Sequence, residues 1–235
     1  MGKILVLSAT SFEQQALQER VEHVVRQVVV GREWVLGKVA GREVLFVATG
    51  IGAVNTAHAL TCVLQAMRPD WVLQVGIGGA YPGSGLAIGD VALANEECYG
   101  DLGERTAEGW QGAELIGIPV LEKGERYFNR FPLDQEWLQK ATSILPDAKV
   151  GAFVTVQECS GTDALGIERA ERFGAVCENM EGAAAAHLCA LYEVPFVEVR
   201  AMSNRVEARN RATWDLPLAL GEAQTAATRL LEEGL

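Results

Sequence analysis

The stretch that decides the fold is Ala175-Val-Cys-Glu-Asn-Met-Glu-Gly-Ala-Ala-Ala-Ala-His-Leu-Cys-Ala-Leu-Tyr-Glu-Val-Pro-Phe-Val-Glu-Val-Arg-Ala-Met-Ser-Asn204. It predicts a short strand, a turn carrying Met180 and Glu181, an alanine-rich helix, a break at Pro195 and a second apolar strand. In an open parallel sheet, ligands bind at the carboxyl ends of the strands. We therefore expect the polar side chains of Glu181 and Asn204 to lie at a ligand-binding edge.

Strands and helices alternate along the rest of the chain. Further strands are expected at 3–7, 71–75, 88–94 and 149–156, a meander of antiparallel strands at 28–30, 34–39 and 43–48, and helices at 12–25, 56–67, 134–144, 164–173 and 216–233. This pattern predicts a single α/β domain over residues 1–235, built on a mixed, largely parallel twisted sheet flanked by helices.

The composition excludes several kinds of partner. The chain has 235 residues, is 49% hydrophobic and carries a formal net charge of −11. That charge argues against nucleic acid or an anionic membrane surface as the main partner, although local arginines can still bind a small anion. The N-terminal apolar run is too short for a signal peptide, and no later run reaches the ~18 residues that span a bilayer. We expect a cytoplasmic protein.

The sequence indicates neither a metal nor a cofactor. Its five cysteines are scattered without Cys-x-x-Cys spacing, and its three histidines are far apart. We expect the cysteines to be structural thiols. The glycine-rich segment after the strand at 71–75 lacks the spacing of a dinucleotide or phosphate fingerprint.

Two glycine-rich segments are still candidates for ligand contact. The first comprises Gly76, Ile77, Gly78 and Gly79. Glycines allow backbone to approach a ligand closely and permit a positive φ, so we expect a substrate-binding turn there. The second, at 49–55, precedes a helix and can seat a polar or anionic group on free backbone amides, although a tight strand-to-helix turn explains it equally well.

Glu13 follows the first expected strand and has two interpretations. With Ser11 as the N-cap, Glu13 lies in the first turn of a helix, where the helix dipole favours a carboxylate. Its place after a strand, like that of Glu181 and Asn204, makes it a candidate for the same ligand-binding edge.

A long segment from 96 to 132 is rich in glycine, glutamate and aromatic residues and is expected to be irregular. Segments of this length inside a compact domain are usually functional flaps or interfaces. Its aromatic residues either cover a ligand or lie half-buried against a partner subunit: Trp110, Tyr127, Phe128 and Phe131.

Several motifs together resemble those of the purine nucleoside phosphorylase/nucleosidase superfamily. They are Val75-Gly-Ile-Gly-Gly79, Ile88-Gly-Asp90, Glu178-Asn-Met-Glu-Gly182 and Val197-Glu-Val-Arg-Ala-Met-Ser-Asn204. The resemblance covers nearly the whole chain. The N-terminal half is more similar to methylthioadenosine/S-adenosylhomocysteine nucleosidases, whereas Ser203-Asn-Arg-Val-Glu-Ala-Arg-Asn-Arg-Ala-Thr-Trp-Asp215 is more like the futalosine hydrolases of menaquinone biosynthesis.

The resemblance implies a three-layer fold, a homo-oligomer of two or more subunits, and cleavage of a ribosyl C1′–N9 bond. It assigns Glu181 to the ribose diol, where an ionised carboxylate accepts hydrogen bonds from both hydroxyls. Met180 packs beneath the sugar as a soft apolar surface. Glu13 falls at the position of the general base that activates the attacking water.

Water, rather than phosphate, is the expected nucleophile. Phosphorylases of this superfamily carry arginines around phosphate, beginning in the loop after the first strand. In this chain the loop is Ser8-Ala-Thr-Ser-Phe-Glu13, and the first arginine is Arg20. A phosphate dianion would be poorly paired there, so the resemblance implies a hydrolase.

Asn204 departs from the adenine-cleaving nucleosidases, which carry an Asp at this position. An Asn amide donates to a 6-oxo group, and its carbonyl accepts from a protonated N7. We therefore expect a 6-oxopurine leaving group, hypoxanthine, as futalosine hydrolysis to dehypoxanthine futalosine requires. Futalosine also carries a benzoate, for which Arg209 and Arg211 are candidate partners, unless they form surface or subunit ion pairs.

Futalosine hydrolase activity is thus the leading hypothesis for this chain. The alternatives are a methylthioadenosine/S-adenosylhomocysteine nucleosidase, a purine nucleoside phosphorylase, and a nucleoside-binding protein without catalysis.

Overall fold

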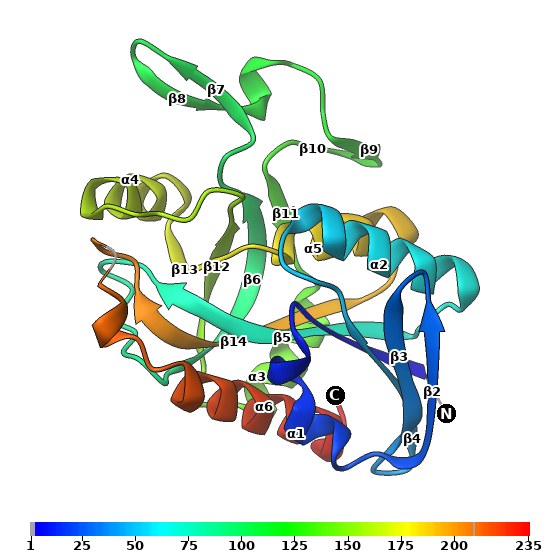
Figure 1. Cartoon of the computed structure of the whole chain (residues 1–235). Helices are drawn as coiled ribbons and strands as arrows, with labels where there is room; N and C mark the ends of the chain where they lie inside the picture. Colours follow the sequence, from blue (N-terminus) through cyan, green and yellow to red (C-terminus); the bar gives the residue numbers. More distant parts are fainter. Residues whose placement is uncertain (1–2, 209) are drawn as a thin grey trace.

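One large twisted sheet runs through the computed structural model, which describes residues 3–208 and 210–235 (Figure 1). Its strands are β1 (Lys3–Ser8), β2 (Glu22–Val29), β3 (Arg32–Val39), β4 (Arg42–Ala48), β5 (Trp71–Ala80), β6 (Val91–Tyr99), β11 (Arg130–Pro132), β12 (Lys149–Thr155), β13 (Ala175–Asn179) and β14 (Phe196–Arg205). The predicted mixed sheet is confirmed. Parallel pairs join β1 to β4 and β5, and the predicted meander β2–β3–β4 is antiparallel.

Half of this sheet closes on itself, a closure that the sequence did not predict. Strand β14 pairs with β5 on one side and with β6 on the other. The ring continues from β6 through β12 and β13 and returns to β5, where Gly79 pairs with Glu178. This closure brings the ends of β5, β13 and β14 together at one edge.

Helices cover both faces of the sheet and complete three layers (Figure 1). One face carries α2 (Ala53–Ala66) and α5 (Gly182–Tyr192), and the other carries α3 (Gln135–Ile144) and α6 (Leu216–Glu233). The side chains of β1 alternate between the two cores, as a strand requires. Leu5 and Leu7 pack towards α2 and α5, while Ile4 and Val6 pack towards α6. A further helix, α4 (Asp163–Phe173), lies against β12 and β13.

The helix predicted at 12–25 is wrong. A 3₁₀ turn, η1 (Ser11–Glu13), is followed by the short α1 (Gln15–Gln18), and β2 begins at Glu22. Thr10, rather than Ser11, is the N-cap of η1. The segment at 22–29 contains several valines, which favour a strand, and pairing with β3 stabilises it there.

The glycine-rich turn predicted after Val75 is also wrong. Strand β5 continues without a break to Ala80, and Gly76, Gly78 and Gly79 are all extended within it. These glycines therefore matter because they have no side chain, which leaves space for neighbouring groups. Positive φ values occur instead at Gly50 and Gly52, in the turn before α2.

The segment expected to be irregular forms two small hairpins that project from the sheet (Figure 1, top). They are β7 (Gly103–Thr106) with β8 (Gly109–Gly112), and β9 (Leu121–Lys123) with β10 (Glu125–Tyr127). Its aromatic rings pack within the chain: Trp110 meets Phe173 edge-on and Tyr127 stacks on Phe131. Among the described residues, the helices lack the combined length and apolar character that crossing a bilayer needs.

Candidate active site

A cavity of about 400 Å³ lies at the edge where β5, β13 and β14 meet, and it gathers most of the predicted site residues. Its lining includes Glu13, Ile77, Gly78, Gly79, Met180, Glu181 and Asn204. Phe12 and Trp214 supply its aromatic surface. A further cavity of about 330 Å³ lies between β1, β3 and β4 and is lined by a different set of residues.

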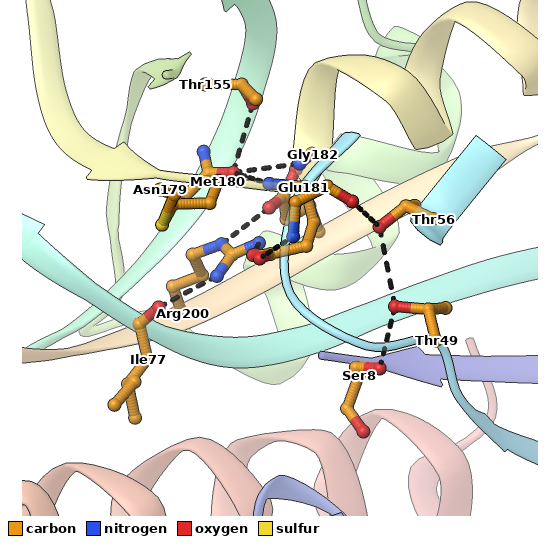
Figure 2. A network of polar contacts seen from close by, with 12 residues as sticks. Ser8, Thr49, Thr56, Ile77, Thr155, Asn179, Met180, Glu181, Gly182 and Arg200 are labelled. Carbon is orange, nitrogen blue, oxygen red and sulfur yellow. Dashed lines mark hydrogen bonds and ion pairs between the residues drawn. The ribbon is translucent and has the colours of Figure 1, made fainter. Parts of the chain in front are cut away.

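Glu181 lies two residues after the end of β13 and is 3% exposed. Its Oε1 accepts a hydrogen bond from the backbone N–H of Gly52 at 3.1 Å, and its Oε2 accepts from Arg200 Nη2 at 3.2 Å (Figure 2). In the glycine-rich turn before α2, for which the sequence left open both an anion site and a simple tight turn, the amide of Gly52 therefore binds the chain's own carboxylate. An acceptor fixed in this way has lone pairs left for the hydroxyls of a sugar.

The backbone at Glu181 is fixed by Asn179. The Oδ1 of Asn179 accepts hydrogen bonds from the N–H groups of Glu181 at 2.9 Å and Gly182 at 2.8 Å (Figure 2). Glu181 is the N-cap of α5 and Gly182 is its first residue, so the Asn179 side chain satisfies two backbone donors at the start of that helix. Between Asn179 and Glu181, Met180 borders the cavity, with its sulfur 3.6 Å from Cys159 Sγ.

Glu13 is 4% exposed and accepts three hydrogen bonds. Its Oε2 accepts from Thr10 N at 2.8 Å and Thr10 Oγ1 at 2.9 Å, and its Oε1 accepts from the N–H of Ile77 at 3.1 Å. Burial raises the pKa of the Glu13 carboxyl above its ordinary value, while the charge of Arg200 and the backbone donors act in the opposite direction. Such a carboxylate is a stronger base than an exposed one and is fixed at the cavity wall.

The glycines of β5 leave room for these side chains. A Cβ on Gly76 would lie 2.8 Å from Glu13 Oε1 and 3.0 Å from Arg200 Nη1. A Cβ on Gly79 would lie 3.2 Å from Asn204 Nδ2. Gly76, predicted as a substrate contact, thus packs directly behind the Glu13 carboxylate.

Arg200 is the main site residue that the sequence analysis missed. It is 1% exposed, and its Nε donates to Glu198 Oε1 at 2.6 Å while its Nη1 donates to the carbonyl of Ile77 at 2.7 Å. Burial lowers the pKa of Arg200, but the carboxylates of Glu198 and Glu181 together raise it above its ordinary value, so Arg200 stays charged. The signal was present in the sequence, because Glu198 and Arg200 are two residues apart in an apolar strand and so share one face.

Asn204 lies near the end of β14, half-buried, where the register between β14 and β5 shifts. A bulge of this kind redirects a side chain, here to the cavity wall. The Oδ1 of Asn204 accepts from Ser203 Oγ at 2.8 Å, and its Nδ2 donates to the carbonyl of Arg205 at 3.0 Å.

A third buried carboxylate, Glu178, fixes a loop that lines the cavity. It accepts from the backbone N–H of Ser160 at 2.9 Å and from the hydroxyl of Tyr81 at 2.9 Å, and Arg169 lies 3.5 Å away. Ser160 and Cys159 of this loop both line the cavity. This anchor was not among the site residues predicted from the sequence.

The two arginines proposed to meet a carboxylate are placed differently. Arg209 lies outside the described residues. Arg211 begins the 3₁₀ turn η3 (Arg211–Thr213), and its guanidinium lies 5.9 Å from the ring centroid of Trp214, which lines the cavity. Within the part of the chain that the structure describes, no group of three or more His, Cys, Asp or Glu side chains is placed to hold a metal ion.

Comparison with known proteins agrees with this geometry. The family model described as "Phosphorylase superfamily" matches residues 3–234. The chain belongs to the phosphorylase superfamily. It is 39% identical over 194 residues to the futalosine hydrolase of Thermus thermophilus, covering 82% of this chain and 83% of that protein. It is 29% identical over 204 residues to a 5′-methylthioadenosine/S-adenosylhomocysteine nucleosidase of Geobacillus, covering 86% and 85%.

Solved structures of this superfamily share the fold. The nucleosidase of Neisseria meningitidis superposes with a TM-score of 0.87 at 22% identity, covering 100% of both chains. The futalosine hydrolase of Helicobacter pylori superposes with a TM-score of 0.86 at 18% identity, covering 99% of this chain and 98% of that one. The predicted resemblance to the superfamily is confirmed, and this chain is an enzyme.

Proposed function

We propose that this enzyme hydrolyses the N-glycosyl bond of futalosine, releasing hypoxanthine and dehypoxanthine futalosine. The observation that carries the proposal is Asn204 on the wall of a cavity that also holds Glu13 and Glu181. The 39% identity to a futalosine hydrolase supports the same substrate.

In the proposed reaction, Glu181 binds the 2′- and 3′-hydroxyls of the ribose, and Met180 packs against the sugar. The carboxylate of Glu181 is already fixed by Gly52 and Arg200, so binding the diol costs little reorganisation. By analogy with glycosidases, hydrogen bonds to the 2-hydroxyl strengthen as the sugar becomes oxocarbenium-like. Glu13, fixed through both oxygens, takes a proton from the attacking water.

The charges around the cavity favour water over phosphate as the nucleophile. Arg200 is the buried guanidinium on the wall, and its charge already faces the carboxylates of Glu181 and Glu198. A phosphate dianion would compete with both carboxylates for that cation. Neutral water meets no such competition beside Glu13.

Asn204 supports a 6-oxopurine as the leaving group. Its amide donates to an exocyclic oxygen, and its carbonyl accepts from N7 once the base is protonated. A 6-amino group at the same place would set one donor against another, which costs about 1–3 kcal/mol when buried. A methylthioadenosine/S-adenosylhomocysteine nucleosidase is the second candidate, favoured by the 29% identity to such an enzyme.

The deciding experiment incubates the enzyme with futalosine or methylthioadenosine, with and without phosphate, and measures the free base and the ribosyl product. The proposal predicts hypoxanthine and the free sugar product from futalosine, at a rate independent of phosphate. Release of adenine alone would support the second candidate. Formation of a ribosyl phosphate would identify a phosphorylase, and nucleoside binding without turnover would identify a binding protein.

We further propose that the chain forms a homo-oligomer. Leu115, Ile116 and Ile118, next to the projecting hairpins, are 55%, 54% and 71% exposed. Neighbouring apolar side chains at this exposure typically mark an interaction surface. Light scattering after size-exclusion chromatography tests this, and the mass of one 25.3 kDa chain at micromolar concentration would contradict it.

A further inference from the structure

Two carboxyl groups outside the cavity, those of Glu97 and Glu198, meet in the protein interior, and both side chains are 0% exposed. Their carboxyl oxygens meet beside Gly182, in space that is open only because this residue has no side chain. A Cβ on Gly182 would overlap Glu97 Oε1 and both carboxyl oxygens of Glu198. Two buried carboxyls this close cannot both be ionised without a large repulsive cost.

Three of the four carboxyl oxygens of this pair accept a hydrogen bond from a described residue, and one does not. Glu97 Oε1 accepts from Asn179 Nδ2 at 2.6 Å, and Glu97 Oε2 accepts from Thr155 Oγ1 at 2.8 Å. Glu198 Oε1 accepts from Arg200 Nε at 2.6 Å. Among the described residues, Glu198 Oε2 is buried without a donor. A proton on Glu97 supplies one.

The surroundings decide which carboxyl carries the proton. Glu198 faces the guanidinium of Arg200, which favours its ionised form. The direct partners of Glu97 are the neutral side chains of Thr155 and Asn179. Burial, and then the charge of Glu198, raise the pKa of Glu97 well above its ordinary value.

Each carboxyl group of the pair is connected to Glu181 by hydrogen bonds through one other residue. On one side, Glu198 binds Arg200, and Arg200 binds the Glu181 carboxylate. On the other side, Glu97 accepts a hydrogen bond from the side chain of Asn179. The Oδ1 of Asn179 in turn accepts from the backbone N–H of Glu181 (Figure 2). The ribose-binding carboxylate and its own backbone are thus held through one buried pair.

We propose that Glu97 is a neutral carboxylic acid that donates its proton to Glu198, and that the two act as positioning residues for Glu181. This inference rests on N-ribosyl hydrolysis as the proposed reaction and is independent of which base leaves. The neutral state of Glu97 also keeps a third negative charge away from Arg200, which already faces Glu181 and Glu198. Neither residue touches the substrate.

Infrared spectroscopy tests the proton without any substrate. The wild-type enzyme at neutral pH is expected to show the carbonyl stretch of a protonated carboxylic acid that disappears in Glu97→Gln. Glu13 can contribute to the same spectral region, so the difference spectrum between wild type and this variant isolates Glu97. Glu136→Gln, at an exposed ion pair on α3, is the matched control and leaves the band unchanged. A difference spectrum between wild type and Glu97→Gln that contains no such band overturns the inference.

Kinetics tests the positioning. The amide of Glu97→Gln still donates to Glu198 but loses the contact from Asn179, so kcat/KM falls less than about tenfold. Glu97→Leu removes the donor, and Glu198→Gln removes the anion beside Arg200. Both are expected to lower kcat/KM by about 10- to 100-fold in the folded enzyme, because a small misplacement of a binding group costs this much.

The outcomes separate this inference from the proposed function. Wild-type kcat/KM in folded Glu97→Leu and Glu198→Gln overturns the positioning role even if futalosine is the substrate. If the wild-type enzyme cleaves no ribosylated purine, the proposed function fails and the positioning role fails with it, while the infrared result still decides the protonation state of Glu97. Circular dichroism establishes that each variant is folded. If Glu97→Leu does not fold, the comparison of Glu97→Gln with Glu198→Gln decides.

Discussion

Glu13→Gln tests the proposed general base, because Gln keeps the size of the side chain and removes its basicity. The carboxylate accepts hydrogen bonds on both oxygens, from Thr10 and from Ile77. A Gln can accept on one oxygen only. Its Nε2 would face either the N–H of Ile77 or the two donors of Thr10, and an unsatisfied buried donor costs about 1–3 kcal/mol.

The expected kinetic effect is larger than the effect on stability. General-base catalysis typically contributes about 10²- to 10⁴-fold, so kcat should fall by that factor. KM should change little, because the ribose and base contacts remain on Glu181 and Asn204. Release of free base from a saturating nucleoside, followed by chromatography, gives both parameters.

The pH dependence separates a base from a structural carboxylate. The raised pKa of Glu13 predicts that kcat of the wild type falls as the solution becomes more acidic than that pKa, and that the Gln variant lacks this acid limb. The stability effect has the opposite sign. Because burial raises the folded pKa of Glu13, the wild type loses stability as the pH rises from the ordinary glutamate pKa through that raised pKa, so the variant's Tm deficit should shrink over the same interval.

Wild-type kcat in a folded Glu13→Gln enzyme would refute the assignment of the base. Glu136→Gln is the control for the chemistry of the substitution. Its side chain is exposed and paired with Lys140, so its effect on stability should stay within about 0.5 kcal/mol and its kcat should be unchanged.

Three further substitutions probe the cavity wall. Asn204→Asp should shift the ratio of 6-oxo to 6-amino nucleoside hydrolysis towards the amino substrate by about 5- to 150-fold, equivalent to about 1–3 kcal/mol, measured with futalosine and methylthioadenosine; an unchanged ratio contradicts the role of Asn204. Gly76→Ala should lower kcat at least tenfold, because its Cβ would displace Glu13 or Arg200, whereas Gly221→Ala, with open space around it in α6, serves as the neutral control. Arg211→Ala should raise KM for futalosine and leave KM for methylthioadenosine unchanged, because methylthioadenosine lacks a carboxylate there; equal KM values for futalosine in both enzymes contradict the contact.

The strand–helix–strand unit could be predicted closely from the sequence. The apolar run predicts a strand, the alanines predict a helix, and Pro195 marks the break before the next strand. The unit folds as β13, α5 and β14. The terminal helix α6 was predicted with the same bounds, because its N-cap at Asp215 and its C-cap at Gly234 are both local signals.

The errors lie where tertiary pairing overrides local pattern. The valines after residue 22 form a strand because β3 lies beside them, and the helix predicted at 12–25 rested on local sequence alone. The glycines of β5 look like a turn in sequence, yet they are an extended strand crowded by Glu13, Arg200 and Asn204. A single sequence carries no sign of which side chains fill the space above a glycine.

The same limit explains the missed polar network. Glu198 and Arg200 were visible as charges on an apolar strand, and their spacing placed them on one face. Their partner Glu97 lies about 100 residues away on β6, and only the closure of the sheet through β14 brings them together. Glu13 and Glu181 were predicted to share an edge because both follow strands, and the structure places both in one cavity.

The most direct test of the central proposal is the product analysis of futalosine hydrolysis at varied phosphate concentration. We predict stoichiometric release of hypoxanthine and dehypoxanthine futalosine, at a rate that phosphate does not change, and slower release of adenine from methylthioadenosine. Faster turnover of methylthioadenosine than of futalosine, or a rate that requires phosphate, would contradict the account.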